Sequence, residues 1–137
     1  MNIRTFATLI FTLGLYFTAR AQDAAAGSLP APSTKTGVTY ATDIKPIFDH
    51  SCVKCHSGEK PKGHLKMDSL DGILKGGKDG KILTAGNSAK SFVVQAVAHT
   101  TDDEDDYMPP VQNKAHIGPL TPEEIGLVRA WIDQGAK

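Results

Sequence analysis

The chain has 137 residues, and its 15 Lys and Arg residues balance 15 Asp and Glu residues, so the formal net charge is zero. This balance excludes the strongly basic composition that is typical of nucleic-acid-binding proteins. The length suits one domain better than two. Hydrophobic residues make up 40% of the chain but aromatic residues only 7%. A small domain of this kind often needs a covalent link or a bound cofactor to complete its interior.

The N-terminal segment has the three-part pattern of a secretory signal peptide. Residues 1–4 carry positive charge, residues 6–18 form an almost uninterrupted apolar run, and the sequence ARA at 19–21 fits a cleavage site. The apolar run is too short to cross a bilayer easily, so an uncleaved membrane anchor is the less favoured alternative. We therefore predict a Sec-type signal peptide over residues 1–21. The mature protein is then periplasmic or otherwise exported, with no stable membrane span.

The predicted linker and the start of the domain follow the signal peptide. Residues 22–37 are rich in Ala, Ser, Pro, Gly and Thr without apolar periodicity, which predicts a flexible linker. The domain itself is expected over residues 38–137. Thr42 and Asp43 offer a cap for its first helix. The apolar positions of that helix follow helical spacing and are Ile44, Ile47 and Phe48.

Two further short helices are expected in the middle of the domain. Ser69 can cap a helix that runs to Leu74 and stops at Gly76. Asn87 can cap the next helix. The side chains of that helix expected to face inward are Phe92, Val93, Ala96 and Val97. An acidic loop that contains prolines is expected to fill residues 101–119.

The last helix has the clearest signals in the sequence. Thr121 and Glu124 form a capping box, and Pro122 occupies the first helical position. One face is then apolar, and its residues are Ile125, Val128, Trp131 and Ile132. Gly135 is expected to end the helix. Since no segment alternates convincingly between apolar and polar residues, the domain is predicted to be all-α.

The strongest local motif is C-x-x-C-H at residues 52–56, which contains both cysteines of the chain. This pattern is the attachment signature of c-type haem. Two thiols about one helical turn apart can each add to one vinyl group of the same porphyrin, and the next imidazole can reach the iron. His56 must be neutral to ligate, and a carbonyl near Pro61 is a candidate acceptor for its other ring nitrogen. We therefore predict one haem c, attached through Cys52 and Cys55 with His56 as an axial ligand.

Other uses of the two cysteines fit the sequence less well. A disulfide between Cys52 and Cys55 would close a very small loop and leave His56 without a role. A thioredoxin-like redox pair normally has a βαβ context, which the helical pattern does not provide. A zinc site needs more ligands, and although His64 is nearby, the spacing matches no familiar zinc finger. A thiol or metal-binding module without haem is therefore the weaker alternative.

Met108 is the favoured second axial ligand of the iron. It precedes two prolines in the sequence YMPP, which can stiffen the segment that holds it. Ligation by Met and His raises the reduction potential and fills the coordination shell, which suits electron transfer. The sequence leaves four other candidates open, namely Met67, His64, His99 and His116.

Residues 38–137 resemble the planctomycete-type cytochrome c domain, within the wider class I cytochrome c fold. The resemblance rests on SCVKCHSGEKPKGHLKMDS, GKILTAGNSAKSFVVQAV, YMPP and LTPEEIGLVRAWIDQGAK, which occur in this order. His64 and Met67 depart from the pattern, because such domains more often carry a glycine and a plain aliphatic residue there. The resemblance covers essentially the whole predicted domain.

The resemblance implies a cytochrome c-like fold of several short helices around one covalently bound haem. It implies that Cys52 and Cys55 attach the haem, with His56 as the proximal ligand and Met108 as the distal one. It also implies that the first and last helices cross beside the haem and bring Phe48 near Trp131. The resemblance names no redox partner.

These features favour one-electron transfer between exported redox proteins over catalysis. The haem would carry the chemistry, and the sequence contains no visible proton-transfer set, nucleotide-binding loop or nucleophile–base pair. A haem enzyme or gas sensor with an open sixth site is the alternative. Five consecutive acids precede Tyr107, namely Asp102, Asp103, Glu104, Asp105 and Asp106. We expect this acidic run to be a solvated loop, with a docking patch for a basic partner or a weak calcium site as alternatives.

Overall fold

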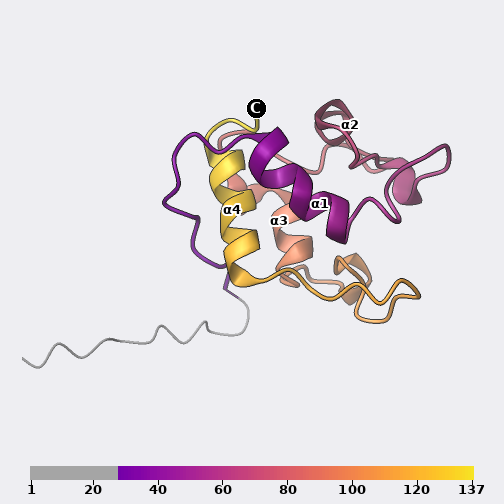
Figure 1. Ribbon diagram of the computed structural model, residues 1–137. Coiled ribbons are helices and arrows are strands. Elements are labelled where there is room, and N and C mark those ends of the chain that lie inside the picture. The colour runs from indigo at the N-terminus through magenta and orange to yellow at the C-terminus, as the bar shows by residue number, and fades with distance from the viewer. Residues whose placement is uncertain (1–27) are drawn as a thin grey trace, which may run out of the picture.

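A computed structural model describes residues 28–137, so the predicted signal peptide and residues 22–27 of the predicted linker lie outside the described residues. The described region is all-α, as expected, and contains no sheet (Figure 1). In chain order its elements are η1 (Tyr40–Ile44), α1 (Lys45–Ser51), η2 (Lys62–His64), α2 (Leu70–Lys75), η3 (Ser88–Lys90), α3 (Phe92–Val97), η4 (Glu104–Asp106) and α4 (Pro122–Asp133), where η marks a short 3-10 or π turn. No helix within residues 28–137 is long and apolar enough to cross a membrane.

The first helical segment begins at Tyr40, earlier than the expected start near Thr42. Thr39 is its N-cap, and its hydroxyl accepts a hydrogen bond from the Thr42 N–H at 3.3 Å. The Asp43 carboxylate in turn accepts from the Thr39 N–H at 2.9 Å. The two predicted capping residues therefore take part in the cap, but the residue at the N-cap position is Thr39. Pro46 lies in the first turn of α1, where its missing N–H costs little.

The second predicted helix is confirmed. The third predicted helix begins later in the chain than expected. Ser69 caps α2 by accepting from the Gly72 N–H at 3.2 Å. Asn87 caps the short η3 turn, and α3 starts only at Phe92. Phe92 lines the cavity, but this first residue of α3 is 43% exposed, so it is not buried as expected, while Val94 is fully buried.

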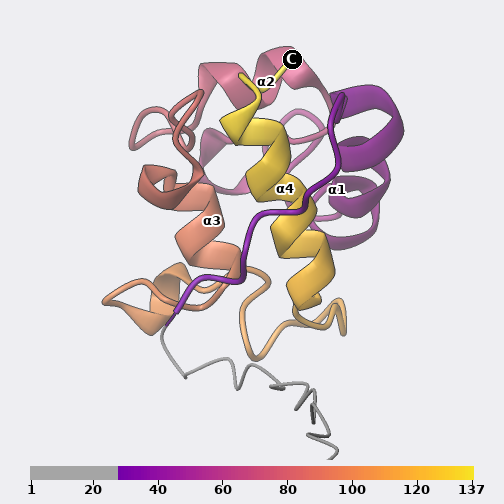
Figure 2. The same cartoon turned by 90° about the vertical axis from the view of Figure 1, so that its left-hand side faces the viewer.

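Helix α4 is confirmed together with its predicted cap. The Thr121 N–H donates to the Glu124 carboxylate at 2.8 Å, and the Glu124 N–H donates to the Thr121 hydroxyl at 3.2 Å. Figure 2 shows α4 lying between α3 and α1. The ring of Trp131 on α4 contacts the ring of Phe48 on α1 edge-on, with 6.4 Å between the centroids. This contact confirms that the first and last helices bring Phe48 and Trp131 together.

The described part of the predicted linker runs across α4 (Figure 2). The Ser33 N–H donates to the Gly126 carbonyl at 2.8 Å, and the Arg129 guanidinium donates to the Pro30 carbonyl. A Cβ atom on Gly126 would lie 2.7 Å from the Ala31 carbonyl oxygen, so only glycine admits this approach. The segment that contacts the domain therefore begins before Val38, the predicted domain start.

Candidate functional site

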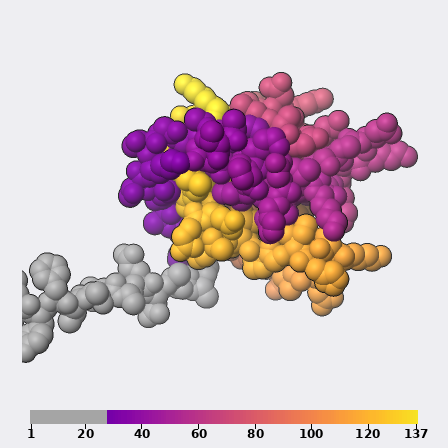
Figure 3. Space-filling view, viewed as in Figure 1, coloured from indigo at the N-terminus to yellow at the C-terminus, as the bar shows by residue number. Residues whose placement is uncertain are grey.

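A cavity that is partly open to solvent lies between the end of α1, helix α3 and the loop that precedes α4. In the space-filling view the magenta atoms that follow α1 lie directly above the orange atoms of that loop (Figure 3). The lining residues are Ser51, Cys52, Cys55, His56, Leu65, Met67, Ile82, Phe92, Val93, Ala96, Val97, Met108, Pro109, Pro110, Asn113 and Ile117. Most of these side chains are apolar, as is typical of ligand and cofactor pockets.

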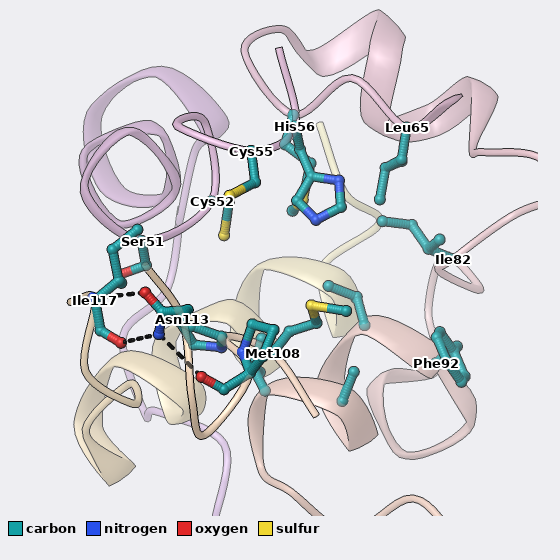
Figure 4. A pocket seen from close by; sticks show the side chains of 16 residues that line it. Ser51, Cys52, Cys55, His56, Leu65, Ile82, Phe92, Met108, Asn113 and Ile117 are labelled. Carbon is teal, nitrogen blue, oxygen red and sulfur yellow. Dashed lines mark hydrogen bonds between the residues drawn. The ribbon is translucent and has the colours of Figure 1, made fainter. Parts of the chain in front are cut away.

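The C-x-x-C-H segment forms one wall of this cavity. Helix α1 ends at Ser51, and the chain then turns so that the N–H groups of Cys55 and His56 both donate to the Cys52 carbonyl, at 3.1 and 3.0 Å. This turn brings both thiols and the imidazole to the cavity (Figure 4). Neither cysteine is in a disulfide, and Cys52 is only 7% exposed. Burial, and to a lesser degree the neighbouring Cys55, raises the pKa of the Cys52 thiol to about 12.

The orientation of His56 is set by a backbone hydrogen bond. Its Nδ1 donates to the Lys62 carbonyl at 3.1 Å, so the acceptor is the residue next to Pro61, in the loop where one was expected. Burial lowers the pKa of His56, and the hydrogen bond to Lys62 opposes this shift only in part. The imidazole is therefore biased towards its neutral form, which is the form that ligates metals.

Met108 faces His56 from the opposite side of the cavity (Figure 4). Its N–H donates to the Ala96 carbonyl of α3 at 3.0 Å, which anchors the segment at this point. Met67 also lines the cavity and is 4% exposed, but its N–H donates to the His56 carbonyl at 2.8 Å. Its backbone therefore lies on the His56 side.

The three histidines that the sequence left open as ligands do not line the cavity within the described region. His64 and His116 are exposed. The ring of His99 stacks on Tyr107, with 4.5 Å between the centroids and 5° between the planes. Of the five candidates for the second axial position, the structure brings the two methionines to the cavity.

The acidic run is exposed for most of its length and includes the η4 turn. The Asp103 carboxylate accepts from the Asp105 N–H at 2.9 Å, which shapes the turn locally. Within residues 28–137 no three His, Cys, Asp or Glu side chains are grouped so that they could hold a metal ion. Neither the weak calcium site nor the zinc site therefore gains support from the geometry.

Sequence reasoning missed the part of the cavity wall built by Leu65, Ile82, Asn113 and Ile117. Asn113 organises the loop before α4, because its amide donates to the Pro110 and Ile117 carbonyls at 2.9 and 2.8 Å (Figure 4). Its side-chain oxygen accepts from the Ile117 N–H at 3.0 Å. An asparagine in a loop rich in proline and glycine is a turn signal, but it does not indicate which cavity the turn closes.

A helical domain with C-x-x-C-H on an apolar cavity has the features of the cytochrome c class. Residues 52–112 match the model of the family described as Planctomycete cytochrome C. This match supports a planctomycete-type cytochrome c domain, and the matched segment spans the C-x-x-C-H motif, the acidic run and Met108. Neither a curated protein nor a solved structure matches the chain.

Proposed function

We propose that this protein is an exported monohaem c-type cytochrome that carries single electrons between redox partner proteins. The observation that carries the proposal is that Cys52, Cys55, His56 and Met108 line one apolar cavity. The match to a cytochrome c family supports a haem-containing electron carrier, since such domains usually transfer electrons and do not catalyse reactions.

The residues around the cavity suit the chemistry of a covalently attached haem. Cys52 and Cys55 are free thiols on one wall and follow each other closely enough to react with one porphyrin edge. The bond from His56 Nδ1 to the Lys62 carbonyl leaves the other ring nitrogen for the metal. The Met108 thioether on the facing wall supplies the second axial group in the proposal.

The protein would contribute ligation, burial and a docking surface, while bound haem supplies a one-electron iron couple. The apolar lining limits the access of water to the cavity. Such control of water access helps to set the reduction potential of a metal held there. The Met108 thioether and the His56 imidazole would together hold the iron, which would favour electron transfer over binding of small ligands. With these roles the protein would act as an electron carrier that catalyses no reaction of its own.

The proposed localisation rests on the signal peptide over residues 1–21, with the mature chain starting at Gln22. The mass of the secreted protein tests this start directly. The linker over 22–37 and the domain over 38–137 stay predictions, with the contacts of residues 28–37 on α4 described above.

The test of the function is the visible spectrum of the full chain, expressed with the cytochrome c maturation machinery. Sharp α and β bands after reduction, haem that stays attached after denaturation, and a weak sulfur-to-iron band when oxidised are the expected results. A matched variant with Cys52→Ala and Cys55→Ala should retain no covalent haem. A colourless wild-type product overturns the proposal. Rapid binding of carbon monoxide by the reduced protein contradicts the carrier function and supports a haem enzyme or gas sensor.

A further inference from the structure

The carbonyl that orients His56 belongs to an exposed loop with an unusual backbone. Lys62 begins the η2 turn, where Gly63 has φ 60° and His64 has φ 54°, both in the left-handed region. The Lys62 carbonyl also accepts from the Leu65 N–H at 3.2 Å, so it serves two donors. A change in the position of this peptide would alter the hydrogen bond to His56 directly.

A second turn, at residues 77–80, braces this loop from outside. Gly77 and Gly80 exchange two backbone hydrogen bonds, at 2.9 and 3.1 Å, which makes Lys78 the second residue of a tight turn. The Lys78 N–H points away from this pair and donates to the Gly63 carbonyl at 2.8 Å. Gly63 is bonded directly to Lys62, so the turn holds the residue next to the one that orients His56.

Close packing makes this brace specific to glycine at position 77. A Cβ atom on Gly77 would lie 2.6 Å from the Gly63 carbonyl oxygen and 3.1 Å from Leu65 Cβ. Contacts under 3.0 Å to backbone force one partner to move. Both the hydrogen bond and the steric fit therefore act on the same carbonyl group.

We propose that the 77–80 turn is a positioning element for the axial ligand His56, with Gly77 and the Lys78 N–H as its positioning groups. The inference rests on the proposed haem ligation by His56. A carbonyl that accepts from Nδ1 makes the imidazole a more basic ligand. A more basic ligand favours the oxidised iron, so release of the brace raises the reduction potential.

The sharpest variant is Lys78→Pro in the full haem-loaded chain. Proline is favoured at the second position of such turns, so it keeps the turn while it removes the N–H that donates to Gly63. Lys78→Ala is the matched control, because it removes the same charge and the same exposed contact with Asp79 but keeps the N–H. Any difference between the two variants therefore reports on the contact of residue 78 with the Gly63 carbonyl, because the proline ring takes the place of the N–H and displaces that oxygen from its 2.8 Å position.

Two readouts separate positioning from stability alone. In the reduced, diamagnetic protein the His56 Nδ1 proton should exchange with water about three- to tenfold faster in Lys78→Pro than in Lys78→Ala, the factor that one hydrogen bond implies. The reduction potential of Lys78→Pro should be higher than that of Lys78→Ala. At the midpoint potential of Lys78→Ala, the ratio of reduced to oxidised Lys78→Pro should therefore exceed one. Gly77→Ala should change both readouts in the same direction. Equal exchange rates and equal potentials in Lys78→Pro and Lys78→Ala overturn the inference.

A wild-type measurement decides the case if a variant fails to load haem. In native-state hydrogen exchange the Lys78 amide and the His56 Nδ1 proton should open with the same denaturant dependence, because one local opening exposes both. Different dependences overturn the inference. Wild-type protein without haem contradicts the proposed function instead, so the two failures are distinguishable.

Discussion

The ring of Phe48 meets the ring of Trp131 edge-on, at 81° between the planes and 6.4 Å between the centroids. Both side chains are fully buried. The Phe48 carbonyl accepts from the N–H of Cys52, so the residue that anchors α1 on α4 also anchors the first thiol of the motif. Packing of the two helices therefore fixes the wall of the cavity that carries the cysteines.

Trp131→Ala should destabilise the protein by roughly 3–5 kcal/mol, the usual cost of deleting a large buried aromatic side chain. The variant also loses the bond from the indole N–H to the Lys137 carbonyl, at 2.9 Å. Denaturant unfolding of the haem-loaded protein measures the change in free energy of unfolding. Val111→Ala is the control, since Val111 is 75% exposed and its loss should stay within about 0.5 kcal/mol. Equal effects of the two substitutions would contradict the central role of the Phe48–Trp131 contact.

Substitution of the two methionines should separate the axial ligand from a packing residue. Met108→Ala should abolish the weak sulfur-to-iron band and let the reduced protein bind carbon monoxide. Met67→Ala should keep the band but lower the free energy of unfolding by about 2–5 kcal/mol, because Met67 is buried. The reverse pattern, with the band lost only in Met67→Ala, would assign the second axial position to Met67.

The lowered pKa of His56 predicts how the stability of the haem-free protein depends on pH. Burial lowers the pKa in the folded state below the ordinary 6.5, so the unfolded chain binds a proton at higher pH than the folded one. The contribution of His56 to stability is therefore full above pH 6.5 and is lost as pH falls from there towards the folded pKa. Urea unfolding at several pH values measures it. His56→Gln should flatten this part of the profile, and an unchanged slope in this variant would contradict the prediction.

The two cysteines should react at different rates in the haem-free protein. A thiol pKa of about 12 leaves Cys52 almost entirely protonated at pH 8, and the thiolate is the form that attacks alkylating reagents. Cys55 is partly exposed and should be labelled first. Mass spectrometry after a short exposure to iodoacetamide identifies the modified residue, and both cysteines should react together in denaturant. Faster labelling of Cys52 in the folded protein would show that its thiol is not held in the buried environment described here.

Local signals explain which elements could be predicted from the sequence. The capping box of Thr121 and Glu124 and the cap at Ser69 depend on residues three positions apart, and both were predicted correctly. The C-x-x-C-H motif is equally local, and its two cysteines and its histidine all line the cavity. The position of Phe48 near Trp131 came from the family resemblance, since no local pattern relates residues so far apart.

Capping details, and contacts between distant segments, explain what the sequence could not predict. The start of the first helical segment depends on Thr39, whose hydroxyl accepts from the Thr42 N–H while its own N–H donates to the Asp43 carboxylate. Phe92 has an inward position in the helical pattern, but it begins α3 at the rim of the cavity and is partly exposed. No pattern within the linker predicts that residues 30–33 contact α4. Gly126 indicates this contact only once the structure shows that Ala31 lies against it.

Gly126→Ala should change stability in opposite directions with and without the segment that crosses α4. In the mature chain the new methyl group would meet the Ala31 carbonyl, so the segment must move and the variant should be less stable. In a chain that lacks residues 22–33 this obstacle is gone, and the same substitution should stabilise α4 by up to about 1 kcal/mol, the helix preference of Ala over Gly. Denaturant unfolding of the four proteins gives both effects. The same sign in both backgrounds would mean that residues 28–33 do not lie on Gly126 in solution.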